Sequence, residues 1–224
     1  MKKLIVWDFD GVIADSEKLW VNNWKNLVNK TFNKNFNFKE MADIVAGKSI
    51  ETKKNDLEER GFKISDAFLQ EIVAMDIKSM EESLSLIPGI YECITLPNIS
   101  HCVATGGAKE KTNQKISILG LQNIFNEKNV FVASMVERGK PAPDLFLFAI
   151  KNMGFVPEEC VVVEDSIPGM RAAKAANVDC VAFLACEMNQ TPEHLEKVKA
   201  LGVKNIFYNA SELKEFLESQ INKD

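Results

Sequence analysis

The sequence predicts an α/β fold in which helices cover a parallel β-sheet and a small all-helical domain is inserted after the first strand. Short apolar or β-branched runs alternate with helical patterns along most of the 224 residues, and this alternation is typical of a parallel sheet. The alternation fails once, between the first and second runs, where the chain shows only helical patterns. The 46% hydrophobic content is enough to bury a normal core.

Each element is predicted from the apolar pattern and from the turn residues that bound it. The expected strands are residues 4–7, 102–105, 130–133, 160–163, 180–184 and 205–208. The helices expected to cover them are residues 109–119, 144–153, 168–176, 192–201 and 210–221. Asn209 and Glu212 are spaced for a capping box at the start of the last helix.

The inserted segment contains helical patterns at residues 17–30, 38–46, 50–60 and 65–83. After them the stretch SLSLIPG, residues 83–89, carries a Pro-Gly turn signal and returns the chain to the sheet. We therefore expect one domain made of residues 1–15 and 87–224, and a helical domain made of residues 16–86.

Polar segments follow four of the expected strands. They are WDFD after the first, ATGG after the second, ASMVERGKPAP after the third and VVVEDS at the end of the fourth. In an open parallel sheet, ligands bind beyond the carboxyl ends of the strands. We therefore expect all four segments to meet at one edge of the sheet.

The residue types in these segments suit a metal ion and a phosphate group. Asp8, Glu164 and Asp165 are hard oxygen ligands of the kind that Mg²⁺ prefers, and a metal makes clustered carboxylates tolerable. Thr105 offers a hydroxyl, and the glycines after it let backbone N–H groups approach an anion closely. Lys140 supplies a compact positive charge that a phosphate and a carboxylate nucleophile would share.

Four motifs together resemble the ordered signatures of the haloacid dehalogenase-like hydrolases: DFDGV, VATGG, GKPAPDLF and VVVEDSIPGMRAAKAA. The resemblance is to the branch that contains phosphoglycolate phosphatase and β-phosphoglucomutase, and it covers nearly the whole chain. It implies a Rossmann-like core with a helical cap inserted after the first strand. It also implies a Mg²⁺-dependent phosphatase, a phosphoric monoester hydrolase, that acts on a small phosphorylated metabolite.

The resemblance assigns a role to each motif residue. It implies that Asp8 is the nucleophile that becomes an aspartyl-phosphate. It implies that Asp10 protonates the leaving alcohol and later activates water. Thr105, Gly106 and Lys140 are expected to bind the phosphoryl group.

The same resemblance implies a metal site. Asp8, the backbone carbonyl of Asp10 and Asp165 are expected to hold Mg²⁺, with Glu164 beside them. Dehalogenation is not expected, because the dehalogenases proper lack the second aspartate of the first motif and Asp10 is present here.

The cap is expected to select the substrate. Trp20 stands where β-phosphoglucomutases carry a histidine, and Ile50 stands where they carry an arginine, so phosphatase activity is preferred over mutase activity. Gly47, Lys48 and Ser49 are candidates to meet the non-reacting end of a sugar phosphate, a sugar-acid phosphate or phosphoglycolate. A phosphosugar mutase and a catalytically quiet binding protein on the same fold remain alternatives.

Charge and composition limit the classes of partner that the protein is expected to bind. The formal net charge of −5 argues against nucleic acid or an acidic membrane, since neither attracts a chain without a concentrated basic stripe. The first apolar run is too short for a signal peptide or a membrane span, and the five cysteines form no C-x-x-C pair. We expect a cytoplasmic protein, either a monomer or a small homo-oligomer. His101 and His194 are expected to be structural or at the surface.

Overall fold

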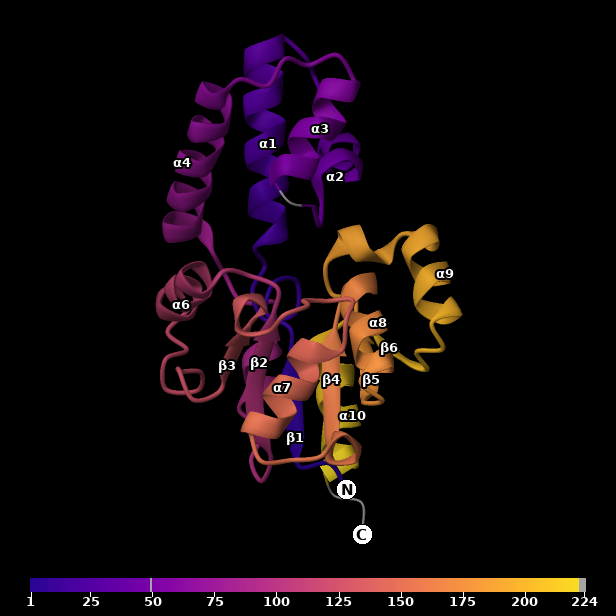
Figure 1. Ribbon diagram of the computed structural model, residues 1–224. Helices are drawn as coiled ribbons and strands as arrows, with labels where there is room; N and C mark the ends of the chain where they lie inside the picture. The colour runs from indigo at the N-terminus through magenta and orange to yellow at the C-terminus, as the bar shows by residue number, and fades with distance from the viewer. Residues whose placement is uncertain (49, 222–224) are drawn as a thin grey trace. The chain divides into compact units, whose positions relative to one another are not determined.

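The computed structural model describes residues 1–48 and 50–221, and within them six strands form one parallel sheet (Figure 1). The strand order is β3-β2-β1-β4-β5-β6. The strands are β1 (Leu4–Trp7), β2 (Ser100–Thr105), β3 (Val130–Val132), β4 (Cys160–Glu164), β5 (Asp179–Phe183) and β6 (Asn205–Phe207). Each predicted strand is present, with ends within two residues of the expected ones. The predicted α/β, Rossmann-like fold is confirmed.

The five helices predicted for the sheet unit are present, with ends within one residue of the expected ones, and the short helix α5 (Ile90–Ile94) was not predicted. The predicted helices are α6 (Lys109–Ile118), α7 (Asp144–Asn152), α8 (Ile167–Ala175), α9 (Pro192–Ala200) and α10 (Ala210–Ile221). Three 3₁₀ helices, η1 (Ala133–Met135), η2 (Pro157–Glu159) and η3 (Glu187–Gln190), join them. The sequence pattern does not reveal α5 or the 3₁₀ helices, because a five-residue helix is too short to show a helical period. Of the predicted capping box, the bond from the Glu212 N–H to Asn209 Oδ1 is present at 3.0 Å.

Helices cover both faces of the sheet. Helices α7 and α8 pack on one face, where their apolar side chains contact Leu4, Val6 and Val162. Because side chains alternate along a strand, Ile5 and Trp7 of β1 point to the opposite face, where α10 lies behind the sheet in Figure 1. All four residues of β1 are fully buried. The central strand is therefore covered on both sides, as its continuous apolar run requires.

The register of the sheet aligns the strand ends that carry polar residues. Trp7, the last residue of β1, pairs with Val103 of β2 and with Val163 of β4. Asp8 and Glu164 therefore follow their paired residues at the same level of the sheet. Because all paired strands are parallel, these residues lie at one edge.

The inserted segment forms a separate helical unit. It consists of α1 (Glu17–Phe32), α2 (Phe38–Val45), α3 (Ile50–Glu59) and α4 (Asp66–Ser83), whose ends lie within two residues of those expected. Helix α1 packs against both α2 and α4, and the rings of Trp24 and Phe68 meet in its core with centroids 5.8 Å apart. The cap segment thus buries an apolar core of its own.

The chain divides into one unit of Met1–Ala14 with Ser85–Asp224 and another of Asp15–Leu84. The sequence pattern places the same junctions one or two residues later. At the junction, the two segments that connect the units contact each other. The Ile87 N–H donates to the Ile13 carbonyl at 2.9 Å, and Ala14 forms a β-bridge with Leu86. These bonds tie both ends of the junction to the sheet unit.

Among the described residues, no helix combines the length and the apolar composition that crossing a bilayer requires.

Candidate active site

The turn after β1 presents two aspartates at the edge of the sheet. Asp8 continues the strand, since its N–H donates to the Val163 carbonyl at 2.9 Å. The chain then turns back through Gly11, whose φ of 85° favours glycine. A Cβ on Gly11 would also lie 2.1 Å from Asp165 Oδ2, so this position has no room for a side chain. The glycine of the DFDGV motif therefore lets the turn approach the end of β4.

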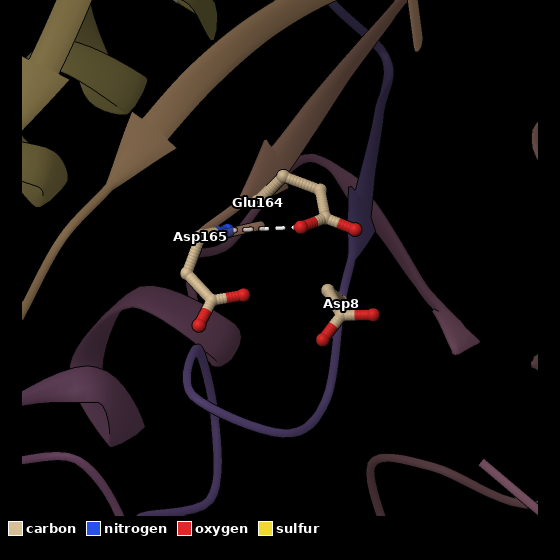
Figure 2. Close-up of side chains that lie close together, drawn as sticks. All are labelled: Asp8, Glu164 and Asp165. Carbon is tan, nitrogen blue, oxygen red and sulfur yellow. Dashed lines mark hydrogen bonds between the residues drawn. The ribbon is translucent and has the colours of Figure 1, made fainter. Parts of the chain in front are cut away.

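Three carboxylates meet at this edge. Asp8, Glu164 and Asp165 each offer an oxygen, and these oxygens lie within 4.8 Å of one another. Figure 2 shows Asp8 coming from the end of β1, and Glu164 and Asp165 from the end of β4. All three residues are buried. Such a cluster needs a compensating positive charge to be stable.

Lys140 supplies part of that charge. Its Nζ lies 2.6 Å from Asp8 Oδ1 and 2.5 Å from Glu164 Oε1, and 4.8 Å from the centre of the Phe146 ring. Burial opposes the charge on this ammonium, but the carboxylates of Asp8 and Glu164 raise the pKa of Lys140 above its ordinary value. The lysine is therefore a permanent cation between two acids.

The protonation of Asp8 is strongly perturbed. Burial raises the pKa of Asp8 to about 7; the Lys140 ammonium opposes this rise, and the Glu164 carboxylate adds to it. One lysine is therefore not enough to keep the whole acidic cluster ionised below neutral pH. A divalent cation beside Asp8 would favour its carboxylate form.

Glu164 has its oxygens occupied by the protein. Its Oε2 accepts hydrogen bonds from the N–H groups of Asp165 and Ser166 and from the Ser166 hydroxyl, each at 2.9 Å. A Cβ on Gly169 would lie 1.7 Å from its Oε1, so the helix α8 backbone packs directly against the carboxylate. Glu164 therefore acts on the cluster by holding Lys140 and the start of α8 in place.

The end of β2 provides the groups suited to an anion. Thr105 is buried at the strand end, and its Oγ1 accepts a hydrogen bond from the Gly107 N–H at 3.1 Å. A Cβ on Gly107 would lie 3.5 Å from Thr105 Oγ1 and 3.7 Å from Asp10 Oδ2, whereas one on Gly106 would meet nothing within 4 Å. The Thr105–Gly107 turn is therefore next to the Asp10 carboxylate.

Two groups beyond β5 contact Asp165, and the sequence pattern does not reveal either contact. Asn189 Nδ2 donates to Asp165 Oδ2 at 2.7 Å, and His194 Nε2 lies 3.0 Å from the Asp165 carbonyl oxygen. Burial lowers the pKa of His194, and the carbonyl opposes that shift. His194 is thus partly buried at the margin of the site, where its contact is with the backbone of an acidic residue.

A further lysine absent from the sequence hypothesis lies at the site. Lys115 of α6 forms an ion pair with Asp10, and only 6% of its side chain is exposed. A lysine in a polar helix is expected at the surface, so composition alone gives no signal for this position.

The candidate cap residues lie in the helical unit and are described within it. Trp20 is partly buried on α1, and the Gly47 N–H donates to Glu17 Oε1 at 2.6 Å. Lys48 Nζ lies 2.5 Å from Asp56 Oδ2 and donates to the Ile44 carbonyl at 2.7 Å. Ser49 is outside the described residues.

The donor set of the acidic cluster fits Mg²⁺. Mg²⁺ is usually bound by one or two protein carboxylates and keeps several waters or phosphate oxygens. Asp8 and Asp165 provide two carboxylates within 4.8 Å, while the hydrogen bonds to Glu164 leave it in a supporting position. The cluster can therefore hold this cation without a full cage of protein ligands.

Comparison with known proteins agrees with this arrangement. Residues 5–183 match the haloacid dehalogenase-like hydrolase family. (DL)-glycerol-3-phosphatase 2 from Arabidopsis thaliana is 30% identical over 190 residues, which are 79% of this chain and 77% of that protein. Fructose-1-phosphate phosphatase YqaB from Escherichia coli is 27% identical over 184 residues, which are 79% of this chain and 94% of that protein.

Solved structures share the fold. The crystal structure of a HAD family hydrolase from Deinococcus radiodurans, with bound phosphate and sodium, has a TM-score of 0.86 at 24% identity. The match covers 98% of this chain and 96% of that one. Because the family match runs from β1 through β5 and includes the strand ends that form the acidic cluster, the chain belongs to the haloacid dehalogenase-like hydrolases.

Proposed function

We propose that this protein is a Mg²⁺-dependent phosphatase that hydrolyses a small phosphorylated metabolite through an aspartyl-phosphate on Asp8. The observation that carries the proposal is the buried contact of Lys140 with both Asp8 and Glu164, next to Asp165. In this proposal these groups supply a nucleophile, a permanent cation and the carboxylates of a metal site at one edge of the sheet. The phosphatases among the relatives support this class of reaction.

The proposed reaction has two steps. First, a carboxylate oxygen of Asp8 attacks phosphorus, the bond from phosphorus to the leaving oxygen breaks, and Asp10 gives that oxygen its proton. Second, Asp10 takes a proton from water, the water oxygen attacks phosphorus, and the bond to Asp8 breaks to release inorganic phosphate. Asp10 is suited to both proton transfers because its carboxylate lies beside the Thr105–Gly107 turn.

The phosphoryl group is held by Lys140, the Thr105 hydroxyl and the backbone around Gly106 in this proposal. Asp8, Asp165 and the Asp10 carbonyl would hold Mg²⁺, which would supply positive charge at the phosphoryl oxygens when bound. Glu164 holds Lys140 through the contact at 2.5 Å. The burial of Thr105 and of the Lys140 side chain strengthens their electrostatic contacts relative to water.

The proposed substrate is a sugar phosphate, a sugar-acid phosphate or phosphoglycolate, and the helical unit is proposed to select it. Trp20, Gly47 and Lys48 are the candidate contacts for the non-reacting end. Because the Lys48 ammonium is paired with Asp56, a substrate anion would have to share it with that carboxylate. Trp20 and Ile50 favour hydrolysis over mutase transfer. All five cysteines are free, which supports a cytoplasmic location.

Phosphate release from a panel of phosphorylated metabolites, with Mg²⁺ and with excess EDTA, tests the proposal. We expect Mg²⁺-dependent release from at least one sugar phosphate, sugar-acid phosphate or phosphoglycolate. Release that persists in EDTA would contradict the metal assignment. Folded protein that releases no phosphate from any compound would instead indicate a binding protein, and efficient conversion of β-glucose 1-phosphate to glucose 6-phosphate with a bisphosphate primer would indicate a mutase.

A further inference from the structure

We propose that Lys115 is a positioning residue for Asp10, fixing the rotation of its carboxylate so that one oxygen serves the leaving group. The inference rests on the proposed phosphatase function and adds a residue that lies outside the four sequence motifs. It assigns to α6 a part in the chemistry.

The pair of Lys115 with Asp10 is unusual in its burial. The Lys115 side chain is 6% exposed and that of Asp10 is 28% exposed. The Lys115 Nζ also lies 5.5 Å from the centre of the Phe9 ring. An ammonium is buried at a large cost in free energy unless it is paired. The carboxylate that pairs with it is the one proposed to move protons.

The two oxygens of Asp10 have different surroundings. Its Oδ1 is the atom in contact with Lys115 Nζ. Its Oδ2 is on the side of the Thr105–Gly107 turn, 3.7 Å from the position of a Cβ on Gly107. The contact with Oδ1 therefore turns Oδ2 toward the groups proposed to hold the phosphoryl oxygens. A lost contact would let the carboxylate rotate about its χ angles.

Helix α6 holds Lys115 rigidly against this turn. Thr112 and Lys115 are three residues apart, so they share one face of the helix, and both are buried. The Thr112 hydroxyl lies 3.1 Å from the position of a Cβ on Gly107, so this face packs on the Thr105–Gly107 turn. Lys109 and Lys111 of the same helix are exposed. The position of Lys115 is thus set by a helix, which is more precise than a loop.

A cation at this position also favours the proposed proton transfer. When Asp10 gives its proton to the leaving oxygen, a negative charge appears on its carboxylate next to the Lys115 ammonium. In the enzyme form whose Asp10 carries the proton, this interaction is weaker before the reaction than in the transition state, and only interactions of this kind speed the chemical step. The benefit is largest for a leaving group that needs the proton, such as phenolate or an alkoxide. It is small for p-nitrophenolate.

The test compares Lys115→Met with Lys115→Arg and with Lys111→Met, which removes an exposed lysine from the same helix. The substrates are p-nitrophenyl phosphate and phenyl phosphate, with saturating Mg²⁺. We expect Lys115→Met to lower kcat/KM for phenyl phosphate by about ten- to a hundredfold, and that for p-nitrophenyl phosphate by less than about threefold. We expect Lys115→Arg to recover part of the loss, and Lys111→Met to resemble the wild type.

Several results would overturn the inference. An equal loss of kcat/KM for both substrates would mean that Lys115 binds the phosphoryl group or only stabilises the fold. No loss for either substrate would mean that the ion pair has no role in the reaction. A large fall in Mg²⁺ affinity of Lys115→Met by calorimetry would show that the lysine acts through the metal site. If Lys115→Met is unfolded by circular dichroism, Lys115→Gln and Lys115→Arg carry the comparison. Wild-type protein without activity on either substrate or on the metabolite panel would overturn the proposed function itself.

Discussion

Asn189 donates a hydrogen bond to Asp165 Oδ2 at 2.7 Å, and this bond joins the 3₁₀ helix η3 to the end of β4. The bond fixes the orientation of a carboxylate that is proposed to hold Mg²⁺. Residue 189 lies beyond the residues that match the family, which end at 183. The acidic cluster is therefore supported by a segment whose sequence is outside the family signature.

Asn189→Ala is expected to weaken Mg²⁺ binding by about tenfold or more, because residues that orient a ligating carboxylate typically contribute this much to metal affinity. Isothermal titration calorimetry with Mg²⁺ measures the effect. Gln190→Ala is the matched control, since Gln190 bonds to the Leu184 carbonyl instead of a carboxylate. If both variants lose affinity equally, the segment as a whole matters and the Asn189 bond does not.

Asp8→Asn is expected to abolish turnover while the protein stays folded. The amide has nearly the size of the carboxylate but lacks its nucleophilic oxygen. Phosphate release from the best substrate of the panel measures the loss, and circular dichroism checks the fold. More than a few per cent of wild-type activity, with contamination excluded, would remove Asp8 from the role of nucleophile.

Mg²⁺ affinity is expected to rise as the pH increases through about 7. In the metal-free protein, burial raises the pKa of Asp8 from 3.8 to about 7, so Asp8 holds a proton below that pH. Mg²⁺ must displace this proton, and above pH 7 it no longer needs to. Calorimetry in buffers of different ionisation enthalpy detects the released proton. Affinity that is the same at pH 6 and pH 8 would contradict this assignment.

His101 is expected to lower the free energy of unfolding as the pH drops through about 6.5, whereas Asp8, whose pKa is raised by burial, contributes in the opposite direction over the same range. His101 Nδ1 accepts a hydrogen bond from Trp7 Nε1 at 3.1 Å, and its Nε2 lies 3.0 Å from the Leu96 carbonyl oxygen. Burial lowers the pKa of His101, with the Leu96 carbonyl opposing the shift. The unfolded chain therefore binds a proton at a higher pH than the folded protein does, which favours unfolding in acid.

Urea unfolding at pH 7.5 and pH 5.5 tests this expectation. When the pH is lowered from 7.5 to 5.5, His101→Gln is expected to lose less stability, or to gain more, than the wild type does. His194→Gln measures the contribution of the second histidine, whose pKa is also lowered by burial. An unchanged difference in His101→Gln would mean that other groups account for the whole pH dependence.

Gly169→Ala is expected to lower the free energy of unfolding by about 1–3 kcal/mol, the usual cost of forcing extra volume into a packed site. The new Cβ would lie 1.7 Å from Glu164 Oε1, and Glu164 is fully buried and held by several hydrogen bonds. Gly106→Ala is the matched control, because a Cβ there meets nothing within 4 Å. Equal stability of the two variants would show that Glu164 can move aside.

The strand pattern is strong evidence for this fold because buried parallel strands are continuous apolar runs. The runs around Val6 and Val162 end on acids, and parallel pairing then brings the acids to one edge. A reader of the sequence can therefore locate Asp8 and Glu164 without knowing any side-chain position. The ends of the longer helices are likewise visible, since Pro192 and other turn residues mark them.

The supporting residues are harder to predict because their environment is set by tertiary packing. Lys115 has the composition of a surface residue, although its neighbour Ile116 and Thr112 mark the buried face of α6. Asn189 lies in a segment whose apolar residues show neither a helical nor a strand period. Gly169 reads as part of a Pro-Gly helix start, and only the position of the Glu164 side chain shows why it has no Cβ.

Strand β1 lies between two strands that come much later in the chain, so Leu4 pairs with Ser100 on one side and Cys160 on the other. Such distant pairings close long loops and form slowly. During synthesis the N-terminal part emerges first, and Asp8 stays apart from Asp165 until β4 has left the ribosome. A cation that needs both acids binds only after β1 and β4 have paired. Its binding would therefore stabilise chains in which these two strands are paired over every chain in which they are not.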